Sequence, residues 1–180
     1  MTAPNLLLPD YDDFSSTEHT LRFLWQLLQA TDAKIVIEAG TYYAHFTNIA
    51  ASVVKPRGGH VYTADTVNYC RFKSLQDNGL VECVDFIHGD FTDIANRFPE
   101  ILGQVDFAFI DSGAPFAYQW EDGCRFRHYE LAKSWLAPGG IIVTDDIGNP
   151  DWEGAERIRA EAGILLPHIG HGLALVQKPL

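Results

Sequence analysis

Acidic side chains recur at the ends of short apolar runs, and their placement is the first sign of chemistry in this sequence. The runs are "KIVIEAG", "HVYTAD", "VDFIHGD", "VDFAFID" and "GGIIVTDD", each rich in Val, Ile or Phe. If these runs are parallel strands, one edge of the sheet collects Glu38, Asp65, Asp90, Asp111, Asp145 and Asp146. Clustered carboxylates are costly unless they meet cations, hydroxyl groups or hydrogen-bond donors. This edge is therefore where we expect a ligand.

The segments around these runs supply the other elements. Continuous apolar runs of this length are typical of parallel strands covered on both faces. "SSTEHTLRFLWQLLQATD" predicts a helix ahead of the sheet, with a capping box from Ser15 to Glu18. "GILLPHI" and "GLALVQK" are too close together for a crossover, so we expect a hairpin. The remaining helices are predicted at residues 46–54, 69–78, 94–98, 124–136 and 152–162.

Together these elements predict an α/β fold. We expect a doubly wound, mainly parallel, seven-stranded, Rossmann-like sheet with an antiparallel C-terminal hairpin. Residues 1–180 are expected to form a single domain, in which 1–33 are an N-terminal helical extension and 34–180 are the Rossmann-like core. In such sheets ligands bind outside the carboxyl ends of the strands, which is the edge that carries the acids.

Composition excludes several classes of function. The 13 Lys and Arg residues against 24 Asp and Glu give a formal net charge of -11, which opposes nucleic-acid binding. Three cysteines form neither a disulfide framework nor a CxxC metal knuckle, and they favour reduced thiols. The sequence shows no apolar run long enough to span a bilayer and no basic signal-peptide start. We therefore expect a cytoplasmic protein with no nucleic-acid or membrane partner.

The stretch "VIEAGTYYAHFT" after the first expected strand narrows the ligand. Gly40 allows the backbone to approach a ligand, and Asp65 stands where a carboxylate can accept both hydroxyls of a ribose. A dinucleotide enzyme would need G-x-G-x-x-G for the pyrophosphate, yet Gly40 is the only glycine between Glu38 and Gly58. The pattern favours a nucleoside cofactor with no phosphate and a positive charge, and it disfavours a dinucleotide-dependent oxidoreductase.

From Lys34 to Lys178 the sequence resembles the class I S-adenosylmethionine-dependent methyltransferases. "VIEAGTYYAHFT" is similar to their E-x-G-x-x-x-G motif, with Ala44 in place of the last glycine, and "HGDF" and "LAPGGIIVTDD" match later motifs. The resemblance implies that Asp65 holds the ribose hydroxyls and that Asp90 and Phe91 flank the adenine. It implies a cofactor site for S-adenosyl-L-methionine formed by Glu38, Gly40, Tyr42, Asp65, Thr66, Asp90, Phe91 and Asp111.

Within that superfamily the sequence is nearest to the small catechol-type O-methyltransferases. By this resemblance Asp111 and Asp145 are catalytic, and with Asp146, which replaces the usual Asn, they bind Mg²⁺ or another divalent cation. The group's usual lysine is absent, because its place is Ala114. In the alternative interpretation, Asp111 and Asp145 touch cofactor or substrate directly and Asp146 caps the turn "DIGNP". The base is then a histidine, and His45, His128 and His171 are the candidates.

The resemblance implies that the protein methylates a small-molecule acceptor, on an oxygen atom in preference to a nitrogen atom. The aromatic segment "SGAPFAYQWEDGCRFRHYE" predicts a lid over the acceptor, although helix packing accounts equally for Phe126 and Tyr129. Because no cap domain encloses the acceptor, a homodimer is a further expectation. Two alternatives stay open: a non-catalytic S-adenosylmethionine-binding protein and, less favoured, a dinucleotide-dependent oxidoreductase.

Overall fold

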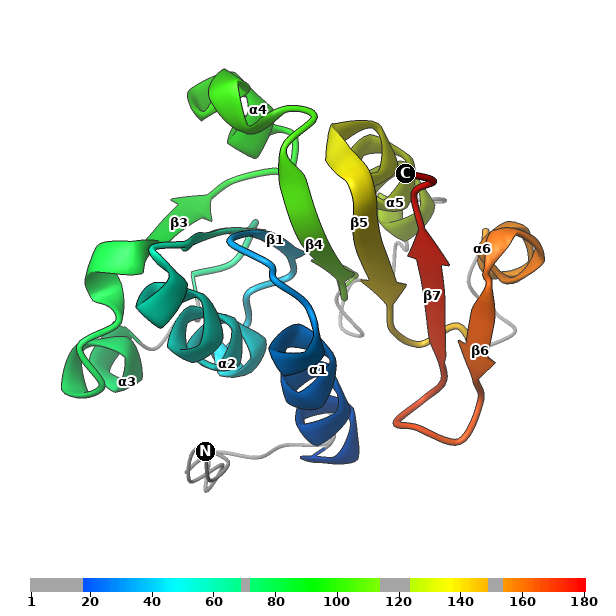
Figure 1. The fold of residues 1–180 in the computed structure, drawn as a ribbon, viewed down its shortest axis with the longest axis horizontal. Coiled ribbons are helices and arrows are strands. Elements are labelled where there is room, and N and C mark those ends of the chain that lie inside the picture. Colours follow the sequence, from blue (N-terminus) through cyan, green and yellow to red (C-terminus); the bar gives the residue numbers. More distant parts are fainter. Residues whose placement is uncertain (1–17, 69–71, 114–123, 149–153) are drawn as a thin grey trace.

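A seven-stranded sheet of order β3-β2-β1-β4-β5-β7-β6 forms the centre of the molecule (Figure 1). The computed structural model describes residues 18–68, 72–113, 124–148 and 154–180. β1 to β5 pair in parallel, and β7 runs antiparallel to both β5 and β6. The predicted fold class is confirmed. The strands are β1 (Ile35–Ala39), β2 (His60–Asp65), β3 (Val84–His88), β4 (Val105–Ile110), β5 (Leu136–Thr144), β6 (Ile164–Leu166) and β7 (Leu173–Gln177).

Helices cover both faces of the sheet, as continuous apolar strands require. Alternation along β4 divides the core, because Phe107 and Phe109 face α1 and α2 whereas Ala108 and Ile110 face α5 and α6. All of these side chains are at most 1% exposed. The helices are α1 (Glu18–Ala30), α2 (His45–Val54), α3 (Phe72–Asp77), α4 (Asp93–Arg97), α5 (Cys124–Trp135) and α6 (Ala155–Glu161), with 3₁₀ turns at Lys55–Arg57, Val81–Cys83 and Pro99–Ile101.

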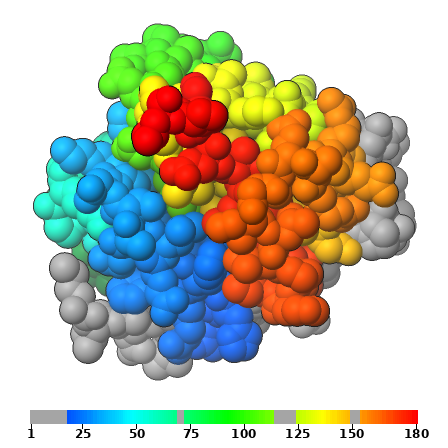
Figure 2. Space-filling view, turned by 45° about the vertical axis from the view of Figure 1, so that its right-hand side comes forward, coloured from blue at the N-terminus to red at the C-terminus, as the bar shows by residue number. Residues whose placement is uncertain are grey.

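The helical extension is joined to the core rather than appended to it. Leu21, Leu24 and Leu28 of α1 are fully buried, and α1 lies beside the C-terminal hairpin on the surface (Figure 2). Arg57 donates hydrogen bonds to carbonyls at the end of this helix, including that of Thr31 at 2.7 Å. The predicted Ser15 cap lies outside the described residues. Within the described ranges, no helix has the length and apolar character needed to cross a membrane.

Two local differences from the sequence prediction have backbone causes. β5 begins at Leu136, ahead of the expected run "GGIIVTDD", because Leu136 pairs with Val105 across a register shift. Ala44, at the start of α2, has φ 64° and ψ 29°, which is a left-handed conformation. L-residues other than glycine rarely adopt this conformation. This explains why the related motif carries glycine where this chain has alanine.

Candidate functional site

The carboxyl ends of β1 and β4 are hydrogen-bonded to each other beside Gly40. The Gly40 amide donates to Ala64 O at 3.0 Å, and the Asp111 amide donates to Ala39 O at 2.9 Å. Gly40 has φ 94°, and a Cβ on it would stand 2.4 Å from the Asp111 carbonyl oxygen. Glycine is therefore required here on both steric and conformational grounds. The Gly40 backbone and the main chain at Asp111 together form one side of the sheet edge at which the parallel strands end.

Asp65, at the end of β2, faces the turn that follows β1. One oxygen of its carboxylate accepts from the Tyr42 amide and the other from the Val67 amide, each at 2.9 Å. Tyr42 has φ 44° and its ring lies 4.1 Å from the ring of Tyr43. Thr66 is exposed next to Asp65. The structure thus brings Gly40, Tyr42, Asp65 and Thr66 together at this edge.

Asp90, after β3, is held at the other end of the same edge. Its carboxylate accepts from the Thr92 amide and hydroxyl at 2.9 and 2.6 Å, and Arg127 donates to it at 2.7 Å. Burial acts to raise the pKa of Asp90, but the Thr92 hydrogen bonds and the Arg127 charge outweigh it and lower that pKa. The Phe91 ring is 2% exposed and stacks on Trp135, so its placement does not support ring contact with an adenine.

His128 of α5 joins the ends of β3 and β4. Its Nδ1 is 2.8 Å from the Ser112 hydroxyl, and its Nε2 is 3.8 Å from the Asp90 carboxylate. Burial lowers the pKa of His128 to about 4, so the ring is neutral at neutral pH. A neutral buried imidazole in this position fixes strand ends and accepts protons poorly. It is a weak candidate for a general base.

Glu38 lies beneath the edge rather than on it. Its carboxyl is 1% exposed, and the hydroxyls of Thr47 and Thr63 donate to the same oxygen at 2.5 and 2.7 Å. Burial raises the pKa of Glu38 to about 8, against the lowering effect of these hydrogen bonds. The expected direct contact of this side chain with the cofactor does not fit its burial. Glu38 instead ties β1 to β2 and α2.

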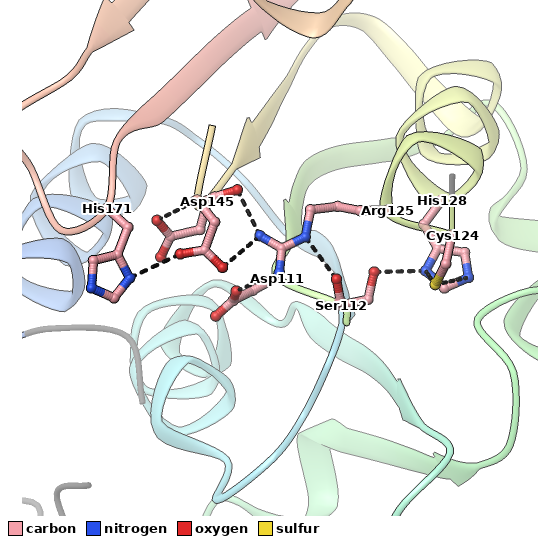
Figure 3. A network of polar contacts seen from close by, with 8 residues as sticks. Asp111, Ser112, Cys124, Arg125, His128, Asp145 and His171 are labelled. Atoms are coloured by element: carbon pink, nitrogen blue, oxygen red, sulfur yellow. Dashed lines mark hydrogen bonds and ion pairs between the residues drawn. The ribbon is translucent and has the colours of Figure 1, made fainter. Parts of the chain in front are cut away.

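Arg125 occupies the middle of the acid cluster at the ends of β4 and β5 (Figure 3). This side chain is 5% exposed, and its Nε donates to Ser112 O at 2.7 Å. Its Nη1 donates to Asp145 O at 2.7 Å and to a carboxylate oxygen of Asp146 at 2.8 Å. Its Nη2 lies 3.6 Å from a carboxylate oxygen of Asp111. One guanidinium therefore bridges two strand ends and two carboxylates.

The neighbouring aspartates Asp145 and Asp146 differ in burial, because Asp145 is buried and Asp146 is half-buried. Asp145 is 3% exposed, and its carboxylate accepts from the Asp146 amide at 2.8 Å. Burial, then the Asp111 and Asp146 charges, raise the pKa of Asp145 well above its ordinary value. Asp146 has φ 59° and contacts His171 Nδ1 at 3.0 Å. Asp145 is thus enclosed, while Asp146 points toward the hairpin loop.

The expected metal set does not fit a divalent cation in this arrangement. Asp111 and Asp146 face the Arg125 guanidinium, and Asp145 is engaged by the backbone of its own turn. In the part of the chain that the structure describes, no three His, Cys, Asp or Glu side chains are grouped to hold a metal ion. We therefore assign no metal-dependent step to these aspartates.

Sequence reasoning did not find Arg125, which organises this edge. A signal was present, because buried acids need a cation and the connection from β4 to β5 carries Arg125 near its helix start.

The aromatic residues of the expected lid that the structure describes belong to the helix packing. Tyr129 is fully buried and Phe126 stacks on it, so these aromatic residues pack the helix. The remaining expected lid residues, at 114–123, lie outside the described residues. His45 lies 6.0 Å from Tyr43, ring to ring.

Comparison with known proteins decides the family. A family model described as a methyltransferase domain matches residues 37–147, which is more than half of the chain. The chain belongs to this methyltransferase family. The resemblance to class I S-adenosylmethionine-dependent methyltransferases is confirmed. The matched residues include all six acids at the strand ends, which are Glu38, Asp65, Asp90, Asp111, Asp145 and Asp146. No match to this methyltransferase was found among curated proteins.

Solved structures show the same fold. A methyltransferase from Geobacter sulfurreducens aligns with a TM-score of 0.71 at 17% identity, covering 96% of this chain and 92% of that one. The O-methyltransferase TomG from Streptomyces achromogenes gives 0.69 at 18%, with 95% and 84% covered. An O-methyltransferase from Bacillus cereus gives 0.73 at 20%, with 93% and 84% covered. The methyltransferase described here has the full fold of these proteins at low identity.

The buried Glu38 carboxyl makes a testable contribution to stability. Its pKa is raised from 4.5 to about 8, so between these pH values the folded state keeps a proton that the unfolded state releases. Stability must then fall as pH rises through this window, by at most about 1.4 kcal/mol per pH unit. Glu38→Gln removes this proton linkage. In urea unfolding, we expect the variant to gain stability relative to the wild type from pH 5 to pH 8; an unchanged difference would contradict the assignment.

Proposed function

We propose that this methyltransferase transfers the methyl group of S-adenosyl-L-methionine to a hydroxyl oxygen of a small-molecule acceptor. The observation that carries the proposal is the meeting of Gly40, Tyr42 and Asp65 at the carboxyl edge of a sheet whose family is known. TomG was solved with S-adenosylmethionine and the Bacillus cereus protein with S-adenosylhomocysteine, and both are O-methyltransferases. Their fold and this edge support the same cofactor here.

The cofactor is proposed to lie along the strand ends from β4 to β3. Asp65 is suited to ribose hydroxyls because the Tyr42 and Val67 amides fix its carboxylate at this edge while each oxygen can still accept a further hydrogen bond, and Thr66 stands exposed beside it. Asp90, which Thr92 and Arg127 hold in position, is proposed to bind the adenine end together with the main chain of Phe91. The Asp111 main chain lies against Gly40, and its carboxylate is proposed to face the cationic sulfonium end.

The reaction requires alignment and removal of one proton. The acceptor oxygen forms a bond to the methyl carbon while the carbon–sulfur bond breaks, leaving a neutral thioether, and the hydroxyl proton passes to a base. Among the histidines, His171 fits this role. Its side chain is 64% exposed, and Asp146 holds its Nδ1, which directs Nε2 away as a proton acceptor. Asp146 is then a positioning residue.

The partners of the enzyme and its location in the cell belong to the same proposal. A net charge of -11 is consistent with a small-molecule acceptor and with no nucleic-acid partner. Cys83 and Cys124 are free thiols, which supports a cytoplasmic location. Ile164 and Leu165 are 54% and 42% exposed on β6 at the sheet edge, and they support a homodimer.

Cofactor binding is expected to depend on the Asp65 carboxylate. In calorimetric titration of S-adenosylhomocysteine, Asp65→Asn should weaken binding by roughly 10- to 100-fold, because charged hydrogen bonds to the ribose are lost. Asp85→Asn is the matched control, since Asp85 is also a strand aspartate but it contacts His60. Equal affinities of the wild type and Asp65→Asn would contradict the site, and binding of NAD alone would contradict the function.

The role of His171 is tested by turnover. On any acceptor that the wild type methylates, His171→Gln should lower kcat by about 100-fold or more and leave the affinity for S-adenosylmethionine unchanged. Formation of S-adenosylhomocysteine reports the rate. His168→Gln, an exposed histidine in the same loop, should retain wild-type turnover. An unaffected kcat in His171→Gln would remove this residue from the mechanism.

A further inference from the structure

The carboxylates that the resemblance assigns to a metal already have a cation between them. Arg125 Nη1 is 2.8 Å from Asp146, and Nη2 is 3.6 Å from Asp111. Figure 3 shows the guanidinium beside the Asp111 and Asp145 side chains, on the side of Arg125 that faces His171. Divalent cations bind carboxylate oxygens at about 2.0–2.6 Å. An ion shared by these two carboxylates would therefore stand against the guanidinium.

The guanidinium cannot give way to an ion by losing its charge. Arginine stays protonated in proteins, so the repulsion between a divalent ion and Arg125 would persist at every working pH. Lysine or histidine in this position could deprotonate and admit a metal. The identity of the residue thus matters as much as its position.

Main-chain contacts also prevent the side chain from swinging aside. Arg125 donates to the carbonyls of Ser112 and Asp145, which end β4 and β5, both at 2.7 Å. The side chain is 5% exposed and starts from the first turn of α5. Displacing it would leave two buried carbonyls without these donors, which is costly. Its position is therefore a fixed part of the fold.

We propose that Arg125 is the resident cation of the strand-end acids, in the place that catechol-type relatives give to a divalent ion, and that this enzyme works independently of such metals. Arg125 is a positioning residue: it orients Asp146, which in turn holds His171. Only the catalytic part of the inference rests on the proposed methyl transfer. The occupation of the acid cluster by Arg125 can be tested by itself.

The first experiment measures metal and cofactor binding separately on the same protein. Mn²⁺ is titrated into wild-type protein treated with EDTA, with free Mn²⁺ followed by electron paramagnetic resonance and S-adenosylhomocysteine binding followed by calorimetry. We expect no one-to-one Mn²⁺ binding up to about 1 mM. One tightly bound Mn²⁺ per chain that is lost in Asp111→Asn would overturn the proposal. Failure to bind S-adenosylhomocysteine would contradict the proposed function alone, because the manganese result decides the cation inference.

The second experiment measures charge compensation by thermal unfolding. Removing one partner from a buried ion pair leaves the other uncompensated, so Arg125→Met should lower Tm by about 10 °C. Adding Asp146→Asn, which keeps the shape and tolerates the left-handed backbone, should restore several degrees. Arg57→Met is the matched control, because Arg57 donates to main-chain carbonyls and Asp146→Asn should restore nothing there. No recovery in the Arg125→Met background would overturn the proposal.

Discussion

The contact of one buried guanidinium with two strand ends is the interaction on which this edge of the molecule depends. Parallel strands β4 and β5 place Asp111, Asp145 and Asp146 side by side, and this arrangement is electrostatically unfavourable without a cation. Arg125 supplies that charge and also binds the carbonyls that end both strands. The same contact fixes the start of α5, which carries Arg127 and His128 toward Asp90. One side chain therefore sets the geometry of the whole β3-to-β5 edge.

The acidic side chains in the two halves of this sheet edge are held by different kinds of interaction. Around β1 and β2, Asp65 is held by backbone amides and Glu38 by threonine hydroxyls beneath the surface. Around β4 and β5, the acids are held by a guanidinium. Amides and hydroxyls leave a carboxylate able to exchange partners with a ligand, whereas a buried ion pair does not. This contrast agrees with ligand contacts at Asp65 and with a fixed orientation of Asp146.

The fold could be predicted from the sequence because its signals are local. A few consecutive apolar residues are enough to predict a buried strand such as β4. Its neighbours Phe107 and Ala108 face opposite layers of the core, so both faces of the strand are apolar. Gly40 and Asp65 could be placed for a similar reason, since strand ends fix them. For Arg125 the only signal was the need of the buried acids for a cation, because its partners are 13 to 21 residues away and two of them are main-chain carbonyls. Burial of Glu38 and Phe91 likewise depends on helices packed across the sheet, which no motif reveals.

The most direct measurement is a crystal structure of the wild-type protein grown with S-adenosylhomocysteine and MnCl₂, with anomalous data collected for manganese. The expected result is a nucleoside whose ribose hydroxyls contact Asp65, with Arg125 between Asp111 and Asp146 and no manganese peak among these aspartates. A manganese ion bound to Asp111 and Asp146 with Arg125 displaced would contradict the proposal that Arg125 is the resident cation of these acids. A cofactor bound away from Asp65 would contradict the assignment of the site.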